Sequence, residues 1–235
     1  MQCVILAGGL GTRMLPVTAV VPKVLLSVAG RPFASWQLEW LAAQGITSVV
    51  YCIGHLGHMV RDHVRDEGAH GLDIAFVEER DQLMGTAGAL RLAADEGVLQ
   101  STFLVLYGDS WLQVDPAAVL RTAMAGPLPA LMTVHRNDGA WDTSNVEYSD
   151  GVVTRYEKNL DPVPPAMRWI DYGLLAFDRS LITDRVPAGE PSDLAPLCTA
   201  LAREHRLAGF EVADRFYEIG SVEGLRELDA LLSGR

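Results

Sequence analysis

The segment Val4-Ile5-Leu6-Ala7-Gly8-Gly9-Leu10-Gly11-Thr12-Arg13 decides the fold of this chain. It opens with a short apolar run, which is typical of a buried β-strand, and three glycines follow. Glycines after a strand let the backbone turn and bring its N–H groups close to an anion. The segment is not a Walker A loop, because no lysine directly follows the last glycine. It also departs from the Rossmann GxGxxG spacing, and the alternative interpretation is an ordinary glycine-rich turn.

Strand and helix signals alternate along the first half of the chain. Residue patterns of helical period predict helices over residues 35–44, 58–66 and 86–95. Short apolar runs predict strands over residues 48–53, 72–77 and 103–107. Strands separated by helices of this size pair in parallel, with helices on both faces of the sheet. The predicted fold class is therefore α/β, with a doubly wound, mostly parallel sheet of Rossmann-like type.

The second half of the chain carries a different pattern. Residues 145–148 and 152–156 flank Asp150-Gly151, a dipeptide typical of a two-residue turn, so we expect an inserted antiparallel hairpin. A further strand is predicted over residues 169–177, a closing helix over residues 222–232, and a proline-rich loop near the site over residues 159–165. Because the connecting loops are short, we expect a single domain over residues 1–235.

The composition restricts the class of protein. The net charge of −11 argues against nucleic-acid binding, because phosphate backbones are held by clustered lysine and arginine. No apolar run is long enough to span a bilayer, and the first residues lack the positive charge of a signal peptide. Three separated cysteines form no metal-binding pattern. We therefore expect a cytoplasmic protein with neither a nucleic-acid nor a membrane partner.

Three charged side chains stand where phosphate chemistry would need them. Arg13 and Lys23 follow the glycine segment and would supply positive charge beside a phosphate chain. Asp109 follows the predicted strand 103–107, and open α/β sheets bind ligands at the carboxyl ends of their strands. Its carboxylate would suit Mg²⁺, whereas the alternative interpretation is a helix cap or turn residue.

The run from Leu6 to Pro16, followed by residues 21–32, resembles the signature of the sugar-1-phosphate nucleotidyltransferase family. The order of glycine loop, Thr12-Arg13, and then Pro22-Lys23 is long and specific, and similar segments continue through most of the chain. The resemblance implies that Arg13 contacts the leaving pyrophosphate and that Lys23 and Asp109 act at the reacting centre. It implies nucleotide binding by Leu6, Ala7, Gly8, Gly9, Gly11, Thr12, Glu79, Gly85 and Thr86.

The resemblance also implies a Mg²⁺ site with two carboxylate ligands, Asp109 and Glu218. Members of the family usually carry an aspartate where Glu218 stands. Glutamate is also a hard oxygen donor, but its side chain is one methylene longer. The alternative interpretation of Glu218 is a solvated carboxylate before a helix.

Base recognition is expected around the small residues that open the helix predicted over residues 86–95. Glu79 stands just before this segment, and a carboxylate could accept the two donors on the Watson–Crick edge of guanine. Arg80 and Gln82 leave cytosine and uracil open as alternatives. An edge glutamate exposed to water is the ordinary interpretation of Glu79.

The sugar phosphate is expected to bind in the second half of the chain. Asn145, Glu157, Lys158, Asp171 and Gly173 resemble the sugar-phosphate-binding elements of the family. Glu157 would hold sugar hydroxyls and Lys158 the sugar phosphate. Family members often carry glycine where Asn145 stands, which leaves room for an unusual sugar. Without the resemblance, an exposed Glu157–Lys158 pair at a strand end would be unremarkable.

The resemblance implies an enzyme that converts a nucleoside triphosphate and a sugar 1-phosphate to a nucleotide sugar and pyrophosphate, with Mg²⁺. Residues of about 1–110 would bind the nucleotide and residues of about 111–235 the sugar phosphate. Residues 28–33 look closest to bacterial D-glycero-D-manno-heptose 1-phosphate guanylyltransferases, so guanylyl transfer to a heptose or hexose 1-phosphate is expected. Alternatives are uridylyl or cytidylyl transfer to an amino sugar, cyclitol phosphate or phosphonate, and a non-catalytic nucleotide-sugar sensor. A homodimer is one possible assembly.

Overall fold

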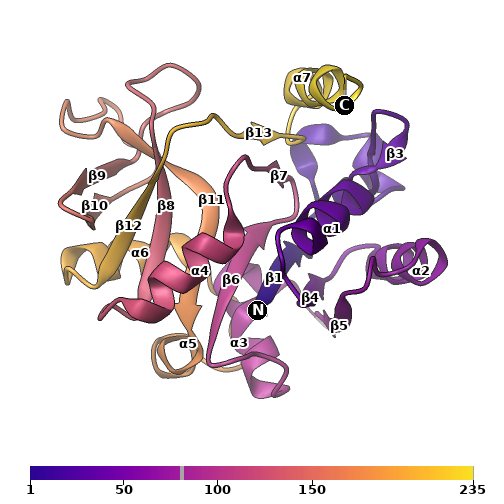
Figure 1. Ribbon diagram of the computed structural model, residues 1–235, viewed down its shortest axis with the longest axis horizontal. Coiled ribbons are helices and arrows are strands. Elements are labelled where there is room, and N and C mark those ends of the chain that lie inside the picture. The colour runs from indigo at the N-terminus through magenta and orange to yellow at the C-terminus, as the bar shows by residue number, and fades with distance from the viewer. Residues whose placement is uncertain (80–81, 235) are drawn as a thin grey trace.

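The computed structural model describes residues 1–79 and 82–234 and contains a nine-stranded sheet with helices on both faces (Figure 1). The strand order is β5-β4-β1-β6-β11-β8-β12-β10-β9. The bounds of these strands are β1 Gln2–Ala7, β4 Ser48–Ile53, β5 Asp73–Glu78, β6 Thr102–Tyr107, β8 Ala130–Arg136, β9 Val146–Ser149, β10 Val152–Tyr156, β11 Trp169–Asp178 and β12 Leu207–Val212. The predicted α/β fold class is confirmed.

The first half of the sheet is parallel, as the alternating strand and helix signals predict. Strand β1 pairs with β4 on one side and with β6 on the other, and β4 pairs with β5, all in parallel. Most residues of β1, β4 and β6 are buried and none is exposed, because helices cover both faces of these strands. Their carboxyl ends therefore meet at one edge of the sheet.

The strands of the second half of the chain add antiparallel pairings, so the complete sheet is mixed rather than mostly parallel as predicted. Strand β11 lies between β6 and β8 and runs antiparallel to both, whereas β12 is parallel to β8. The predicted hairpin is present, with β9 and β10 joined at Asp150 and Gly151. Both turn residues have positive φ, 51° and 80°, which is the backbone conformation that a tight hairpin turn of this kind requires.

Seven helices are found in the described part of the chain. Their bounds are α1 Phe33–Ala43, α2 Gly57–Glu67, α3 Gly85–Asp95, α4 Pro116–Ala125, α5 Arg179–Arg185, α6 Leu194–Arg203 and α7 Val222–Leu232. One apolar core joins α3, α5 and α6 to one face of the sheet, and a second joins α1, α2 and α4 to the other. Adjacent residues of β1 divide between them, with Val4 in the first core and Ile5 in the second.

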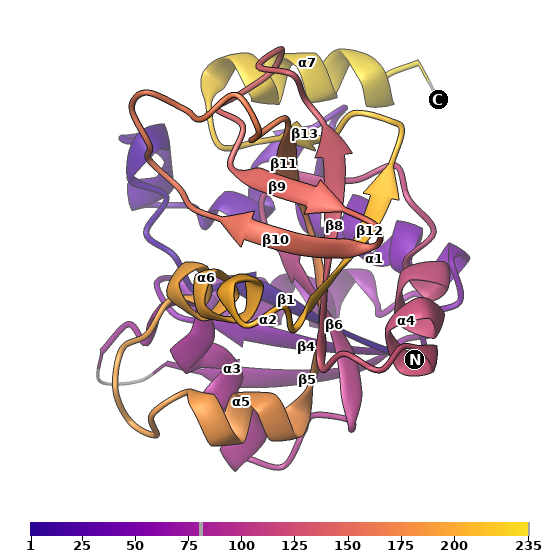
Figure 2. The same cartoon turned by 90° about the vertical axis from the view of Figure 1, so that its left-hand side faces the viewer.

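A third apolar cluster holds the C-terminal segment near the carboxyl end of β1. It joins Leu228 and Leu232 of α7 to Ile219, Trp111 and Met14. Two short antiparallel pairs lie here, β2 (Ser27–Val28) with β3 (Arg31–Pro32) and β7 (Ser110–Trp111) with β13 (Tyr217–Glu218). Figure 2 shows α7 across this end of the molecule. Among the described residues, no helix is long and apolar enough to cross a membrane.

Candidate functional site

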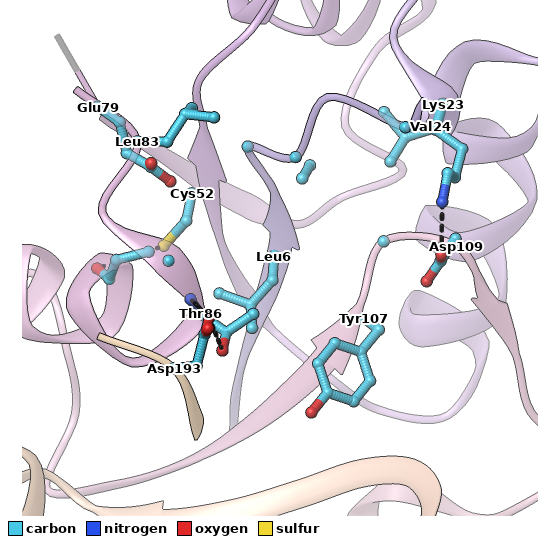
Figure 3. Close-up of a pocket in the computed structure, with 17 residues that line it drawn as sticks. Leu6, Lys23, Val24, Cys52, Glu79, Leu83, Thr86, Tyr107, Asp109 and Asp193 are labelled. Atoms are coloured by element: carbon cyan, nitrogen blue, oxygen red, sulfur yellow. Dashed lines mark hydrogen bonds and ion pairs between the residues drawn. The ribbon is translucent and has the colours of Figure 1, made fainter. Parts of the chain in front are cut away.

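A cavity of about 320 Å³ opens beside the carboxyl ends of β1 and β6 (Figure 3). It brings together segments that lie far apart in the sequence: the glycine loop after β1, the start of α3, and the turn after β6. The predicted site residues that line it are Leu6, Ala7, Gly8, Gly9, Gly11, Lys23, Glu79, Gly85, Thr86 and Asp109. Thr12 and Arg13 lie outside its wall, at the start of a 3₁₀ turn over Thr12–Met14.

The glycine loop is shaped by close backbone approach. Gly11 adopts a left-handed conformation with φ of 63°, which favours glycine. At the neighbouring strand end, the N–H of Gly108 donates to the Leu6 carbonyl at 3.0 Å. A Cβ atom on Gly108 would stand 2.7 Å from that carbonyl oxygen, so no larger residue fits without moving β1 and β6 apart.

Lys23 and Asp109 form an ion pair at the edge of the cavity. Their Nζ and Oδ2 atoms are 2.9 Å apart, and both side chains are largely buried, with exposed fractions of 16% and 22%. Figure 3 shows the lysine reaching across the cavity edge to the carboxylate. Lys23 follows Pro22 in a 3₁₀ turn, so a rigid local backbone sets the direction of its side chain.

Glu218 lies beside Asp109 although the two are far apart in the sequence. Pairing of β13 with β7 places Glu218 opposite Ser110, and the Ile219 N–H donates to the Asp109 carbonyl at 2.9 Å. Burial, and then the charge of Asp109, raises the pKa of Glu218 to about 7, while Arg13 opposes the shift. The two predicted metal ligands, Asp109 and Glu218, and the predicted pyrophosphate-binding residue Arg13 therefore lie close enough for their charges to interact.

The donor set at this point is small. Among residues 1–79 and 82–234, no group of three or more His, Cys, Asp and Glu side chains could hold a metal ion. Two neighbouring carboxylates that repel each other nevertheless fit Mg²⁺, which is commonly bound by one or two carboxylates together with water and substrate phosphates.

Glu79 faces the glycine loop from the end of β5. Its Oε2 accepts a hydrogen bond from the Met84 N–H at 2.6 Å, and the space beside Gly8 is filled by its Oε1. Burial raises the pKa of Glu79, against that hydrogen bond. The residue therefore lines the cavity rather than standing free in water. Arg80, the alternative base contact, lies outside the described residues, and Gln82 is exposed.

Thr86 has a structural partner that the sequence analysis missed. Its backbone N–H and its hydroxyl donate to Asp193 Oδ1 at 3.2 and 3.3 Å, and its hydroxyl accepts from the Leu194 N–H at 2.8 Å. Figure 3 shows Asp193 beside Thr86 at the cavity wall. An aspartate before a helix is a common cap, so its sequence offers no signal of a binding site.

Four of the five predicted sugar-phosphate residues gather around the end of β10 and the start of β11. The buried Asp171 accepts from the Tyr156 hydroxyl at 3.2 Å and from the Gly173 N–H at 3.1 Å. Its own N–H donates to Asn145 Oδ1 at 3.0 Å, and Lys158 Nζ lies 3.9 Å from its Oδ2. Burial raises the pKa of Asp171, and the charge of Lys158 acts in the opposite direction.

The fifth residue, Glu157, is held differently. Its Oε1 accepts from Arg203 at 2.7 Å and its Oε2 from Arg155 at 2.9 Å, which lowers its pKa. Both oxygens are thus already paired. Sequence reasoning also missed Tyr107, which lines the cavity before Gly108 and has Lys158 Nζ 5.9 Å from its ring centre. Tyr107 therefore connects the cavity to the Lys158–Asp171 pair.

The chain is similar to known proteins over most of its length. Residues 2–227 match the nucleotidyl transferase family. The chain is 30% identical to the N-acetylmuramate alpha-1-phosphate uridylyltransferase of Neisseria meningitidis, with 98% of both chains covered. It is 31% identical to the mannose-1-phosphate guanylyltransferase of Mycobacterium tuberculosis over 80% of this chain, but spans only 51% of that protein.

The fold is also shared with solved structures. The crystal structure of HddC from Yersinia pseudotuberculosis complexed with GMP-PN superposes with a TM-score of 0.82, at 22% identity and with 98% of this chain and 99% of that chain covered. At this level of identity, the likeness concerns the fold alone.

Proposed function

Since the chain belongs to the nucleotidyl transferase family and is a sugar-1-phosphate nucleotidyltransferase, we propose that it transfers a guanylyl group to a heptose or hexose 1-phosphate. The observation that carries the nucleotide half of this proposal is the cavity in which the glycine loop, Lys23, Asp109 and Glu79 meet. The acceptor half rests on Lys158 and Asp171, which Tyr107 connects to that cavity.

The proposed reaction is direct attack by a phosphate oxygen of the sugar 1-phosphate on the α-phosphorus of the nucleotide. The bond from that phosphorus to the bridging oxygen breaks, and pyrophosphate leaves with the electron pair. Such a reaction needs positioning and charge neutralisation more than covalent catalysis. Lys23 exchanges Asp109 for a phosphate oxygen, and Arg13 neutralises the leaving pyrophosphate. Lys158 holds the phosphate of the acceptor.

We propose Mg²⁺ as the cofactor, held by Asp109 and Glu218. These carboxylates lie together beside the ion pair of Lys23, and the charge of one raises the pKa of the other. A bound cation would relieve that repulsion and supply charge to the phosphate oxygens. The pairing of β13 with β7 places Glu218 opposite Ser110, the residue after Asp109, and this position supports Glu218 as the second ligand.

Guanine is favoured by the position of Glu79. Its carboxylate lines the cavity and is fixed by the Met84 N–H. A carboxylate pairs with the adjacent N–H donors of guanine, whereas the same edge of uracil presents one donor between two carbonyl oxygens. A second candidate is uridylyl transfer to an amino-sugar phosphate, because the relative covered over 98% of its length is a uridylyltransferase.

The experiment is pyrophosphate release with Mg²⁺, using each nucleoside triphosphate against a panel of sugar 1-phosphates. We expect release only with both substrates, fastest with GTP, and loss of release in Asp109→Asn. Asp150→Asn, an exposed aspartate of the β9–β10 turn, is the matched control and should keep full activity. Preference for UTP would replace the guanylyl assignment. Nucleotide binding without release for any acceptor would indicate a sensor and overturn the proposal.

A further inference from the structure

A second cavity lies outside the site described above. It has a volume of about 560 Å³ and lies between two loops, residues 137–144 after β8 and residues 159–168 between β10 and β11. Figure 2 shows both loops toward the end of the molecule where α7 lies. Its apolar wall includes Trp141, Val163, Pro164 and Met167.

Both walls of this cavity continue directly into the proposed acceptor residues. The first loop ends at Ser144, which precedes Asn145, and the second lies between Lys158 and the start of β11, which carries Asp171. The Asn145 N–H donates to the Trp169 carbonyl at 3.0 Å, so the two loop ends are joined. The cavity is therefore next to the place where the sugar phosphate is proposed to bind.

The first loop is a preformed wall, held internally by one buried residue. Asn137 Nδ2 donates to the Asp142 carbonyl at 2.6 Å and to Ser144 Oγ at 3.0 Å, and its Oδ1 accepts from the Trp141 N–H at 3.1 Å. A side chain that makes three bonds to one loop fixes its shape before any ligand arrives.

Trp141 also contacts a residue outside the loop, Arg215. Its ring centre is 4.1 Å from the Arg215 guanidinium carbon, which lies 4.4 Å from the ring centre of Tyr217, next to Glu218. Arg215 is anchored on α7 by an ion pair with Glu227 at 2.7 Å. Although 55% of Trp141 is exposed, stacking therefore fixes its position.

The charges around the cavity restrict what it can hold. Arg168 is paired with Asp138 at 2.8 Å, so its charge is balanced. Among the described residues Asp142 has no ion-pair partner; its Oδ1 accepts from the Thr143 N–H at 2.6 Å, and its Oδ2 remains as an acceptor. Thr143 adds a hydroxyl to the same wall. A carboxylate would be repelled by Asp142, whereas a hydroxyl or amide N–H could donate to it. Carbon atoms of the same group would pack on Trp141 and Met167.

We propose that this cavity is an acceptor subsite for an uncharged polar substituent on the sugar ring, either a hydroxylated carbon or an acylamino group. The inference rests on the proposed function and specifies its acceptor: a sugar 1-phosphate larger than a plain hexose phosphate. Residues 137–144 then determine acceptor specificity and leave nucleotide binding unaffected.

The test compares acceptors of the same anomeric configuration with and without the substituent. The panel contains mannose and glucose 1-phosphates, a heptose 1-phosphate, N-acetylglucosamine 1-phosphate and glucuronic acid 1-phosphate. We expect kcat/KM for the heptose or the acylamino acceptor to exceed that for its parent hexose by about tenfold or more, which is the discrimination typical of one well-filled subsite. The acceptor with the highest kcat/KM identifies the substituent that the cavity binds.

Val163→Trp fills the cavity from its half-buried wall, and Ala166→Trp places the same side chain on the same loop outside that wall. We expect Val163→Trp to remove the preference for the substituted acceptor while the parent hexose and GTP keep their KM values. Ala166→Trp should behave as the parent protein. Trp141→Ala is a second variant, which opens the wall and should raise KM for the substituted acceptor without changing kcat.

A preference for plain hexose or for glucuronic acid 1-phosphate would overturn the inference, as would an equal loss with all acceptors in Val163→Trp at an unchanged melting temperature. These outcomes leave the proposed function intact, because pyrophosphate is still released. No release with any acceptor would mean that the proposed function itself fails, and the inference with it.

Discussion

Asp171 is a buried carboxylate, and burial raises its pKa. The positive charge of Lys158, whose Nζ lies 3.9 Å from Oδ2, lowers the pKa but does not cancel the effect of burial. A carboxyl group with a higher pKa in the folded than in the unfolded protein binds more protons when folded. Its contribution to stability is therefore greatest at low pH and declines as the pH rises above about 4.

We expect Asp171→Asn to show this dependence directly. Asparagine keeps an acceptor for the Gly173 N–H without the buried charge. The variant should gain stability over the parent between pH 4 and 7, by about 1.4 kcal/mol for each pH unit by which folding raises the pKa. Melting temperatures measured across this range would check it. A difference that does not change with pH would show that packing, not ionisation, governs this position.

Glu218 is one of the two proposed Mg²⁺ ligands, and its charge is the feature to test. Glu218→Gln keeps the size of the side chain and removes the charge beside Asp109. We expect the Mg²⁺ concentration for half-maximal activity to rise about tenfold, equivalent to about 1.4 kcal/mol. Glu218→Asp retains the charge and should show a smaller increase. An unchanged Mg²⁺ requirement in Glu218→Gln would remove Glu218 from the metal site.

At the scale of elements, the packing of β1 against β6 fixes the position of Asp109. Gly108→Ala would place a methyl group against the Leu6 carbonyl and Val24. We expect a loss of about 1–3 kcal/mol of stability, as for other overpacked sites, with a marked loss of kcat because Asp109 moves. Gly9→Ala is the matched control for stability, since nothing lies within 4 Å of a Cβ atom there. Equal melting temperatures for the two variants would contradict this account.

The start of α3 is joined to the start of α6 through Thr86. Thr86→Val removes the hydroxyl bonded to Asp193 and the Leu194 N–H, whereas Thr86→Ser retains it. We expect the valine variant to lose about 1 kcal/mol of stability and to bind nucleotide more weakly, with the serine variant close to the parent. Calorimetric melting and nucleotide titration would measure both. If valine and serine behave alike, the hydroxyl does not join these helices.

Element positions were predicted best where a single residue pattern decides them. Strand β4, helix α7 and the turn at Asp150-Gly151 were each predicted correctly from local spacing. No element was assigned in advance to β8 or β12, which pair with each other in parallel. The direction of β11 could not be predicted either. A strand buried on both faces has the same apolar run whether its neighbours are parallel or antiparallel.

The site residues, too, could be predicted only where they belong to a recognisable sequence motif. Lys23 and Asp109 stand in or beside long motifs, so the sequence predicted residues that the fold brings to 2.9 Å. Asp193 and Tyr107 have no motif, and only the packing of α6 and β6 brings them to the cavity. Glu157 matches the family pattern, but its pairing with Arg155 and Arg203 depends on residues that are distant or unremarkable in the sequence.

At the scale of the whole molecule, we expect nucleotide and Mg²⁺ to stabilise the fold together. The residues proposed to bind them come from the glycine loop, the turn after β6 and the C-terminal segment, so binding holds these three segments to one another. At about 100 times its Kd, a ligand adds about 2.7 kcal/mol, or about 5–10 °C in a chain of this size. We expect GTP with Mg²⁺ to give this shift and GTP with EDTA a much smaller one, by scanning calorimetry. Equal shifts would mean that nucleotide binding does not require the metal.

The place of β11 between β6 and β8 also determines the order in which the sheet can be completed during synthesis. Strands β5, β4, β1 and β6 can pair once residue 107 has left the ribosome, but the outer edge of β6 then has no strand to meet it. That edge is apolar and stays open until residues 169–178 emerge. An open apolar edge readily pairs with other chains. The half-built sheet therefore stays open to such pairing throughout translation of the residues between β6 and β11.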